Sequence, residues 1–217
     1  MQIKEIDKQS KFYPICLKEL DLNVSIKYLG NFRDEDIKTV GLVGTRECTR
    51  YGRKVVRSLV SYLSKAGITI VSGLGYGIDT CVHRSVCAVN GRSIGFLSFS
   101  FDLLHQNEAV PGVNLVKKMI DSPNHVVVSP FSQRIPPSID TYIIRNNVLA
   151  AFCSVLIVVE AGENSNTDSI VEAALEYGKP IFAVPGSIFS EKSTGTHKMI
   201  QEGAYVLGDY KDILNYL

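Results

Sequence analysis

Short apolar runs rich in β-branched residues recur along the chain, and segments of helical periodicity separate most of them. Runs of this kind, free of charged residues, are typical of strands buried on both faces of a parallel sheet. The runs are Thr39–Val43, Ile68–Val71, Ser93–Ser98, Val126–Ser129, Val155–Val159, Ile181–Val184 and Tyr205–Leu207. Because strands alternate with helices, the sequence predicts an α/β fold: a single domain whose mainly parallel sheet is flanked by helices.

The helical segments between these runs have recognisable limits. Apolar residues fall at helical spacing over Val55–Leu63. Ser169 and Glu172 have the spacing of a capping box at the start of a later helix, although Asn166 or Thr167 can equally be its cap. Other helices are expected through Val82–Val89, Asn114–Ile120, Val148–Phe152 and Met199–Ile200.

Residues 1–38 lack this regular alternation. They contain a predicted short helix over Pro14–Leu20 and an extended piece over Val24–Leu29. We therefore expect residues 1–38 to form a lead-in that packs on the domain formed by residues 39–217.

Charge and cysteine content narrow the possible functions. The 217 residues carry a formal net charge of only +1, so affinity for nucleic acid has to come from local clusters of cations. Five cysteines without a C-x-x-C pair and four scattered histidines argue against a disulfide framework and a metal site, and we expect no cofactor. The sequence has neither an apolar run of the ~18 residues that a membrane span needs nor a signal peptide, which predicts a cytoplasmic protein without membrane association.

Ligands of such sheets bind beyond the carboxyl ends of the strands, and one predicted strand end is rich in glycine. Ser72, Gly73, Gly75 and Gly77 follow the second strand, and a helix opened by Asp79 comes next. Glycines let backbone N–H groups converge on an anion at a helix N-terminus, so this turn can hold a phosphate-bearing ligand. A tight turn without a ligand is the alternative.

Two further groups of residues have the chemistry of a nucleic-acid site. Arg46 follows Gly44 and Thr45 just beyond the first strand, where a guanidinium can bind phosphate in bidentate fashion. An ordinary surface ion pair, to Glu47 or Glu160, is the alternative for Arg46.

The second group follows the proline-rich segment Pro130–Thr141, which is predicted to be a surface loop. Tyr142, Arg145 and Asn146 combine an aromatic ring, a cation and an amide, the mixture that binds single-stranded nucleic acid. Packing of a half-buried ring is the alternative role for Tyr142.

Candidates for catalysis are fewer. Glu160, Asp79, Asp168 and His83 can in principle act as a general acid or base. The sequence has no nucleophile elbow, P-loop or metal-ligand spacing. His83 follows Asp79 by one helical turn, so we expect these two side chains to satisfy each other.

Several stretches together resemble one family. They are Tyr13-Pro14 with Tyr28-Leu29-Gly30-Asn31, Val43-Gly44-Thr45-Arg46 with Tyr51-Gly52, Ser72-Gly73-Leu74 with Gly77-Ile78-Asp79 and His83, Arg145-Asn146, Val158-Val159-Glu160-Ala161, Ala183-Val184-Pro185-Gly186-Ser187, and Gly195-Thr196 with Gly203-Ala204. In this order and spacing the set is similar to the DNA-processing protein A family, also called Smf, over residues 11–214.

The resemblance implies an extended Rossmann-like domain that binds single-stranded DNA, forms a homodimer and loads a RecA-type recombinase during natural transformation or recombination. It also implies that Arg46, the arginine of the family's G-[ST]-R motif, lies in the DNA pocket. The expected nucleic-acid-binding residues are Gly44, Thr45, Arg46, Ser72, Gly73, Gly75, Tyr76, Tyr142, Arg145 and Asn146, and we expect no catalytic residue.

The chain departs from the family pattern near the expected DNA pocket. Tyr76 stands where the family's S-G-L-A-R-G-I-D motif has arginine, and Ile143 and Asn147 replace the proline and second arginine of F-P-x-R-N-R. Losing two cations weakens DNA binding, because each phosphate contact releases counterions. The flanking helical modules of many members are not visible here, which suggests a minimal or divergent member.

A second function class remains open. The predicted fold is similar to that of cytokinin-activating phosphoribohydrolases. In such an enzyme, a nucleoside monophosphate would bind at the glycine-rich turn, and Glu160 of this chain would assist its cleavage. A nucleotide-binding sensor is the non-catalytic form of this alternative. The loop Ala161–Thr167 has only one glycine of that group's P-G-G-x-G-T-x-x-E motif. A nicotinamide oxidoreductase is further from the pattern, because the dinucleotide fingerprint is missing.

Overall fold

A single sheet runs through the protein in a computed structural model that describes residues 2–6, 8–20, 24–105, 112–132, 134–163 and 165–217. In those residues the strand order is β1-β2-β6-β5-β4-β3-β7-β8-β9. The strands are β1 (Lys4–Glu5), β2 (Lys27–Leu29), β3 (Thr39–Val43), β4 (Thr69–Gly73), β5 (Ser93–Phe96), β6 (His125–Ser129), β7 (Val155–Val158), β8 (Ile181–Ala183) and β9 (Tyr205–Val206). All neighbours from β6 to β9 are parallel, whereas β2 pairs antiparallel with both β1 and β6.

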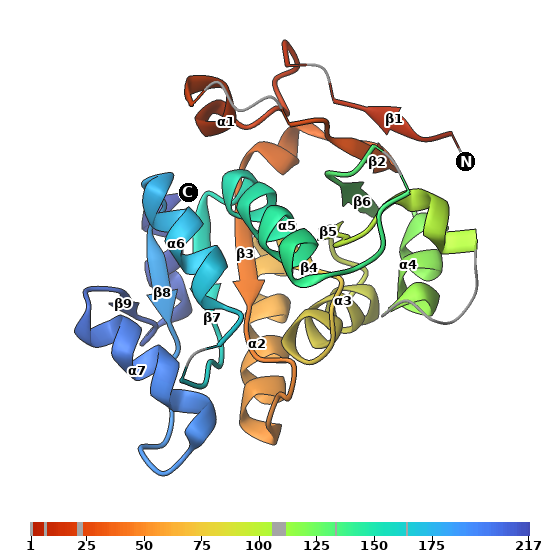
Figure 1. Ribbon diagram of the computed structural model, residues 1–217. Helices are drawn as coiled ribbons and strands as arrows, with labels where there is room; N and C mark the ends of the chain where they lie inside the picture. The colour runs from red at the N-terminus through yellow and green to blue at the C-terminus, as the bar shows by residue number, and fades with distance from the viewer. Residues whose placement is uncertain (1, 7, 21–23, 106–111, 133, 164) are drawn as a thin grey trace.

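Helices cover both faces of this sheet, which explains why the six strands from β3 to β8 are buried at every position (Figure 1). Along β7, Val155 and Ile157 belong to the core cluster of α2 (Arg50–Lys65) and α3 (Ile78–Ala88). The alternate residues Leu156 and Val158 belong to the cluster of α5 (Ile139–Phe152) and α6 (Asp168–Glu176). The remaining helices are α1 (Ile15–Glu19), α4 (Val113–Ile120) and α7 (Thr194–Gln201). The predicted α/β fold with a mainly parallel sheet is confirmed.

Short 3₁₀ segments complete the described elements. They span Asp34–Ile37, Phe101–His105, Glu191–Ser193 and Tyr210–Tyr216. Among the helices of the described residues, none has the length and apolar character needed to cross a membrane.

The strand order reverses beside β3. From this central strand the chain proceeds through β4, β5 and β6 on one side, then crosses over to β7 and β8 on the other. The carboxyl ends of β3 and β7 therefore lie side by side at a topological switch point, where ligands of open α/β sheets bind.

Two predicted boundaries differ from the structure. Residues 142–147 belong to α5, which begins three residues earlier than Tyr142, so the predicted loop is shorter than expected. Ser138 caps this helix: its Oγ accepts from the Thr141 amide at 3.2 Å, and Thr141 Oγ1 accepts from the Ser138 amide at 2.8 Å. The sequence signal is weak because threonine takes the place of the usual Glu or Gln of a capping box.

The predicted capping box at Ser169 is wrong, whereas the alternative cap at Thr167 is confirmed. The side chain of Thr167 makes no capping hydrogen bond. Ser169 lies inside the helix, where its Oγ accepts from Asn146 Nδ2 of α5 at 2.7 Å. A tertiary contact between two helices has thus taken the hydroxyl that local capping would use.

Residues 1–38 contribute to the sheet and to the core. Strand β2 extends the sheet beyond β6, and Tyr13, Leu17 and Ile26 are buried in the core cluster of α5. The division of the chain at residue 38 into a lead-in and a domain stays a prediction.

Candidate nucleic-acid interface

A cavity of about 720 Å³ lies at the switch point, beyond the carboxyl ends of β3 and β4 and beside α5 and the start of α6. Most of the predicted site residues line it: Gly44, Thr45, Arg46, Gly75, Tyr76, Tyr142, Arg145 and Asn146. Ser72 and Gly73 do not line the cavity, because β4 continues to Gly73 and both residues are buried strand positions beneath it. We call this cavity the switch-point cleft.

The exposed cation of the cleft is Arg46. Its guanidinium carbon lies 4.6 Å from the centre of the Tyr142 ring, a cation–π arrangement. Neither acid considered as its partner is available: Glu47 pairs with Lys192 at 2.9 Å, and Glu160 accepts from Thr49. In the described residues Arg46 has no salt bridge, so its N–H groups can meet a ligand.

The glycine turn packs against the loop that carries Arg46. The Ile78 amide donates to the Thr45 carbonyl at 3.1 Å, and Gly77 has φ of +73° with no room for a Cβ against that carbonyl. Only glycine fits such a position.

The amides of the turn are largely occupied by the protein's own groups. Leu74 donates to the Phe96 carbonyl at 3.0 Å, and Gly75 donates to Asp79 Oδ2 at 3.3 Å. The carboxylate of Asp79 therefore takes the position that a phosphate was expected to take. This arrangement favours the tight turn over the phosphate cradle.

Beneath the cleft, Arg145 and Asp79 form a buried ion pair with 3.5 Å between Nη1 and Oδ2. Burial raises the pKa of the Asp79 carboxyl, while Arg145, the Gly75 amide and Ser72 oppose that shift. Gly73 is required here, because a Cβ would fall on the guanidinium of Arg145. Ser72 and Gly73 thus position the ion pair instead of contacting a ligand directly.

Arg145 is only 6% exposed, and its Nε has no hydrogen-bond partner among the described residues. Its guanidinium carbon lies 5.4 Å from the centre of the Tyr142 ring. Tyr142 therefore contacts both the exposed Arg46 and the buried Arg145. The geometry gives Arg145 a role in holding this aromatic ring, and direct contact with DNA stays a prediction.

Asn146 joins the two helices beside the cleft. Its Nδ2 donates to Ser169 Oγ and, at 3.5 Å, to the Asn166 carbonyl, so α5 is tied to the start of α6. Residues 165–167 and Ser169, which line the cleft, are held against α5 by this contact.

The predicted pairing of His83 with Asp79 is wrong. Asp79 faces Arg145, whereas His83 contacts Ser93 Oγ at 3.3 Å and the Gly73 carbonyl at 3.0 Å. Burial and the nearby His125 lower the pKa of His83 to about 4, so the ring is neutral near pH 7. A buried neutral ring with both nitrogens engaged is a structural group.

Of the candidate acids, Asp79 lines the cleft, whereas Glu160 and Asp168 do not. Glu160 is 3% exposed and accepts from the Thr49 amide at 2.9 Å and its hydroxyl at 2.5 Å. Asp168 is the exposed first residue of α6, and it does not line the cleft. Within the described residues no three His, Cys, Asp or Glu side chains cluster in a way that could hold a metal ion.

Sequence reasoning missed Lys192, which lines the cleft beside Glu47. It follows β8 and reaches the site only because the segment after that strand folds back over β7: the Ala161 amide donates to the Lys192 carbonyl at 2.9 Å. Residue 192 lies well beyond the end of β8 at Ala183, and no local pattern in the sequence marks this lysine.

Comparison with known proteins places this geometry in a wider context. A family model described as DNA recombination-mediator protein A matches residues 4–217. The DNA processing protein DprA of Streptococcus pneumoniae is 32% identical over 203 residues, which cover 93% of this chain and 70% of that protein. DprA of Bacillus subtilis is 32% identical over 219 residues, covering 99% and 71% of the two chains.

Solved structures agree with these relatives. The X-ray structure of S. pneumoniae DprA superposes with a TM-score of 0.86 at 30% identity, over 99% of this chain and 74% of that one. DprA of Helicobacter pylori, whose structure describes a single-stranded DNA binding mode, shares the fold with a TM-score of 0.83 at 22% identity, over 99% and 95%. A molybdenum cofactor binding protein from Rippkaea orientalis is a more distant match in fold, with a TM-score of 0.55 at 16% identity over 82% and 93%.

Proposed function

This chain belongs to the DNA recombination-mediator protein A family, and on that premise we propose that it binds single-stranded DNA in the switch-point cleft. It acts in natural transformation or recombination by protecting incoming single strands. It performs this role as a binding protein and catalyses no reaction of its own.

The observation that carries the proposal is the pairing of Arg46 with Tyr142 at the cleft. An exposed guanidinium lies over an aromatic ring, and Gly77 of the glycine turn packs against the backbone of Thr45 and Arg46. Proteins that bind single strands combine cations along the phosphates with aromatic faces on which bases stack. The nearby ring of Tyr76, 59% exposed where the family pattern has an arginine, supplies a second stacking surface.

The orientation of the acids supports a binding role over the hydrolase alternative. In a phosphoribohydrolase-like mechanism Glu160 would have to reach the ligand, yet its carboxylate is engaged by Thr49 at the start of α2. Asp79 lines the cleft but is engaged by Arg145. The resemblance in fold to a molybdenum cofactor binding protein concerns the scaffold alone.

We further propose that the protein works as a homodimer and hands its DNA to a RecA-type recombinase. Membership of the family supports this part of the proposal. We also propose that it acts in the cytoplasm, as the sequence analysis predicts.

The test is the affinity for a ~30-nucleotide single strand, measured by fluorescence anisotropy across a salt series. We expect Kd to rise steeply with salt. Arg46→Ala should weaken binding about tenfold or more, because a hydrogen bond to a charged group contributes about 1.5–3 kcal/mol. The matched control is Arg50→Ala, which removes an exposed arginine on α2 that lines neither the switch-point cleft nor the second cavity beside it.

Wild-type protein that fails to bind at low salt, or that binds without a salt dependence, would contradict the proposal. Equal losses in Arg46→Ala and Arg50→Ala would place the DNA elsewhere on the surface. Release of free base from nucleoside monophosphates above the buffer rate would instead favour the hydrolase alternative.

A further inference from the structure

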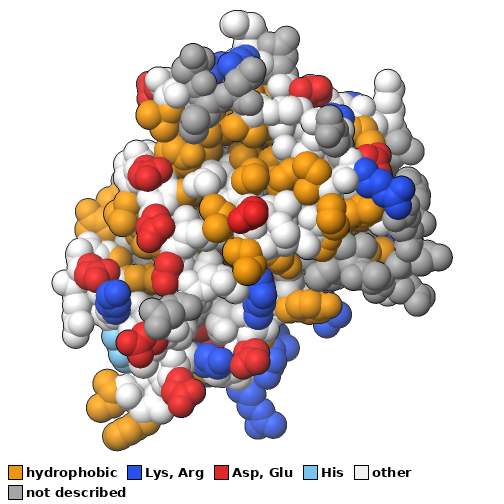
Figure 2. Space-filling view, viewed as in Figure 1, with side chains coloured by type: hydrophobic (Ala, Val, Ile, Leu, Met, Phe, Trp, Pro, Cys, Tyr) orange, Lys and Arg blue, Asp and Glu red, His pale blue; other side chains and the backbone are white. Residues whose placement is uncertain are grey.

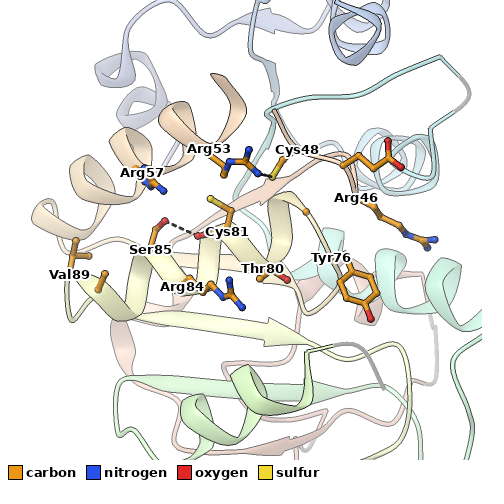
Figure 3. Close-up of a pocket in the computed structure, with 13 residues that line it drawn as sticks. Arg46, Cys48, Arg53, Arg57, Tyr76, Thr80, Cys81, Arg84, Ser85 and Val89 are labelled. Atoms are coloured by element: carbon orange, nitrogen blue, oxygen red, sulfur yellow. Dashed lines mark hydrogen bonds between the residues drawn. The ribbon is translucent and has the colours of Figure 1, made fainter. Parts of the chain in front are cut away.

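A second cavity, of about 1100 Å³, opens between α2 and α3 on the far side of the Arg46 loop (Figure 3). Arg46, Glu47 and Tyr76 line both this cavity and the switch-point cleft, so the two are continuous. We call this second cavity the helix groove. Figure 3 shows Arg46 and Tyr76 at one end of it and Val89 near the other.

Three further arginines line the helix groove. Arg53 and Arg57 stand one turn apart on α2, and Arg84 faces them from α3. All three side chains are exposed, and none forms a salt bridge with another described residue. Glu47 is the one acid in this lining, and its carboxylate already pairs with Lys192.

This concentration of charge contrasts with the whole chain, whose formal net charge is +1. Like charges one helical turn apart destabilise a helix slightly, so the arrangement has a cost in the free protein. A bound polyanion would remove that cost by neutralising the arginines. On the face drawn in Figure 2, Lys and Arg side chains lie interspersed with Asp and Glu. Among the described residues that line the helix groove, by contrast, Glu47 is the one acid.

Between the arginines, the groove is lined by small or apolar groups. Cys48, Cys81 and Ala88 contribute to it, and Ser85 Oγ is occupied by the Cys81 carbonyl at 2.7 Å. Such a lining offers few donors for reading base edges. The guanidinium groups can therefore follow phosphates without regard to sequence.

We propose that the helix groove binds the sugar-phosphate backbone of the single strand that leaves the switch-point cleft, with Arg46 and Tyr76 at the junction. The inference rests on the proposed function, because it extends the same strand from one cavity into the other. One phosphate would need only one or two of these arginines. Four guanidinium groups, spread over a loop and two helices, match a chain of phosphates.

The test compares a ~6-nucleotide strand, short enough for one site, with a ~20-nucleotide strand that can reach both. The variant is Arg53→Gln/Arg57→Gln/Arg84→Gln. We expect the short strand to bind as in wild type, and the Kd of the long strand to rise about tenfold or more. The slope of log Kd against log salt for the long strand should fall by about 2, since each phosphate contact on a single strand contributes ~0.7.

Arg50→Gln/Lys54→Gln/Lys65→Gln is the matched control. It removes the same charge from exposed positions of α2 outside both cavities, and it should leave both strands bound as in wild type. Circular dichroism and thermal unfolding of both variants would show that the fold is retained.

Thiol labelling gives a second readout in the wild-type protein. Cys48 and Cys81 line the helix groove, whereas Cys16 and Cys87 are partly buried elsewhere. The long strand should slow alkylation of the two groove thiols by iodoacetamide and leave the other two unchanged.

The outcomes separate the two proposals. The expected result is that the triple variant loses affinity for the long strand alone, and that the long strand protects Cys48 and Cys81 of the wild-type protein from alkylation. If the wild-type protein binds the short strand and the triple variant binds the long strand as tightly as wild type does, only the proposal for the helix groove is overturned. If the triple variant bound both strands more weakly by the same factor, the proposed path of one strand through two sites would be overturned. If the wild-type protein bound neither strand, the proposed function would be overturned as well.

Discussion

At the scale of single residues, two buried histidines belong to a series of hydrogen bonds in which the donor and the acceptor of each bond are fixed. Ser93 Oγ contacts His83 Nδ1 at 3.3 Å and His125 Nδ1 at 3.0 Å, and His83 Nε2 donates to the Gly73 carbonyl. Because Ser93 has one proton, it donates to His83 and accepts from His125 Nδ1, and His125 Nε2 then accepts from the Cys87 thiol at 3.4 Å. Every member is satisfied with both rings neutral.

This chain predicts loss of stability in acid. Burial is the main cause that lowers the pKa of both His83 and His125 to about 4, against 6.5 for a free histidine. As pH falls from 6.5 to about 4, the unfolded chain binds protons that the folded protein does not, so the free energy of unfolding should fall, by about 2–3 kcal/mol from His83 alone. Urea unfolding at several pH values measures this loss.

His83→Gln is the informative variant. It should have a shallower pH dependence than wild type, whatever its stability at pH 7. Asp79 acts in the opposite sense, because its raised pKa lowers stability as pH rises through the folded value, but it is present in both proteins. Parallel pH profiles for wild type and His83→Gln would show that His83 is not the group responsible.

At the scale of elements, the start of α2 is fixed by an acid that follows β7. Thr49 Oγ1 accepts from the Gly52 amide at 3.1 Å and donates to Glu160, whose other oxygen accepts from the Thr49 amide. A carboxylate beside a helix N-terminus is favourable, and Gly52 leaves the room that Glu160 needs. The loop that carries Arg46 thus ends on a rigid anchor.

Thr49→Ala should remove the cap and weaken this anchor. We expect a loss of about 1–2 kcal/mol in the free energy of unfolding, measured in urea, because the hydroxyl satisfies one helix N–H and one carboxylate oxygen. Thr49→Ser keeps the hydroxyl and should remain close to wild type. A serine variant as unstable as the alanine variant would mean that the methyl packing, and not the cap, is what matters.

At the scale of the whole molecule, residues 1–38 are joined to the sheet by a buried ion pair. Asp36 accepts from Arg92 Nε at 2.9 Å and from Thr69 Oγ1 at 2.8 Å, and the same arginine donates to the Asn31 carbonyl at 2.7 Å. The pair lies beside the start of β4 and β5. It connects the first part of the chain to the strands that carry the glycine turn.

Asp36→Ala should destabilise the whole fold. Removing one partner leaves Arg92, 7% exposed, without its counter-ion, and a broken buried pair costs about 3–5 kcal/mol. Asp34→Ala is the matched comparison, because Asp34 pairs with Lys11 in solvent and should matter little. Chemical denaturation measures the free energy of unfolding of both variants. Similar losses of stability in the two variants would contradict the structural role of the Asp36–Arg92 pair.

The predicted fold and the observed fold agree where the signal is local. The run at residues 155–159 is apolar at every position, as a strand covered on both faces must be, and it forms β7. Agreement weakens at element ends. The second strand was expected to stop at Val71 but continues to Gly73, which moves Ser72 and Gly73 from the cleft into the sheet.

Site residues could be predicted from the sequence where they lie just beyond the end of a strand. Arg46 follows a central strand, and its exposure on the cleft follows from the strand-end rule. Arg145 was expected to bind nucleic acid because of its neighbours Tyr142 and Asn146 and the family resemblance; it lines the cleft, but its guanidinium is buried against Asp79. The partner is 66 positions away in sequence, and no local pattern indicates the contact.

The sequence by itself determined that this chain forms an α/β sheet with a glycine-rich strand end, since hydrophobic period and turn chemistry depend on neighbouring residues. Only the tertiary structure decided which charges are free. Packing of α5 on the sheet pairs Arg145 with Asp79, whereas packing of α2 beside α3 places Arg53, Arg57 and Arg84 together, and none of these three forms a salt bridge within the described residues. The physical reason is that the cost of burying or crowding a charge depends on groups brought together by folding, and these are distant along the chain.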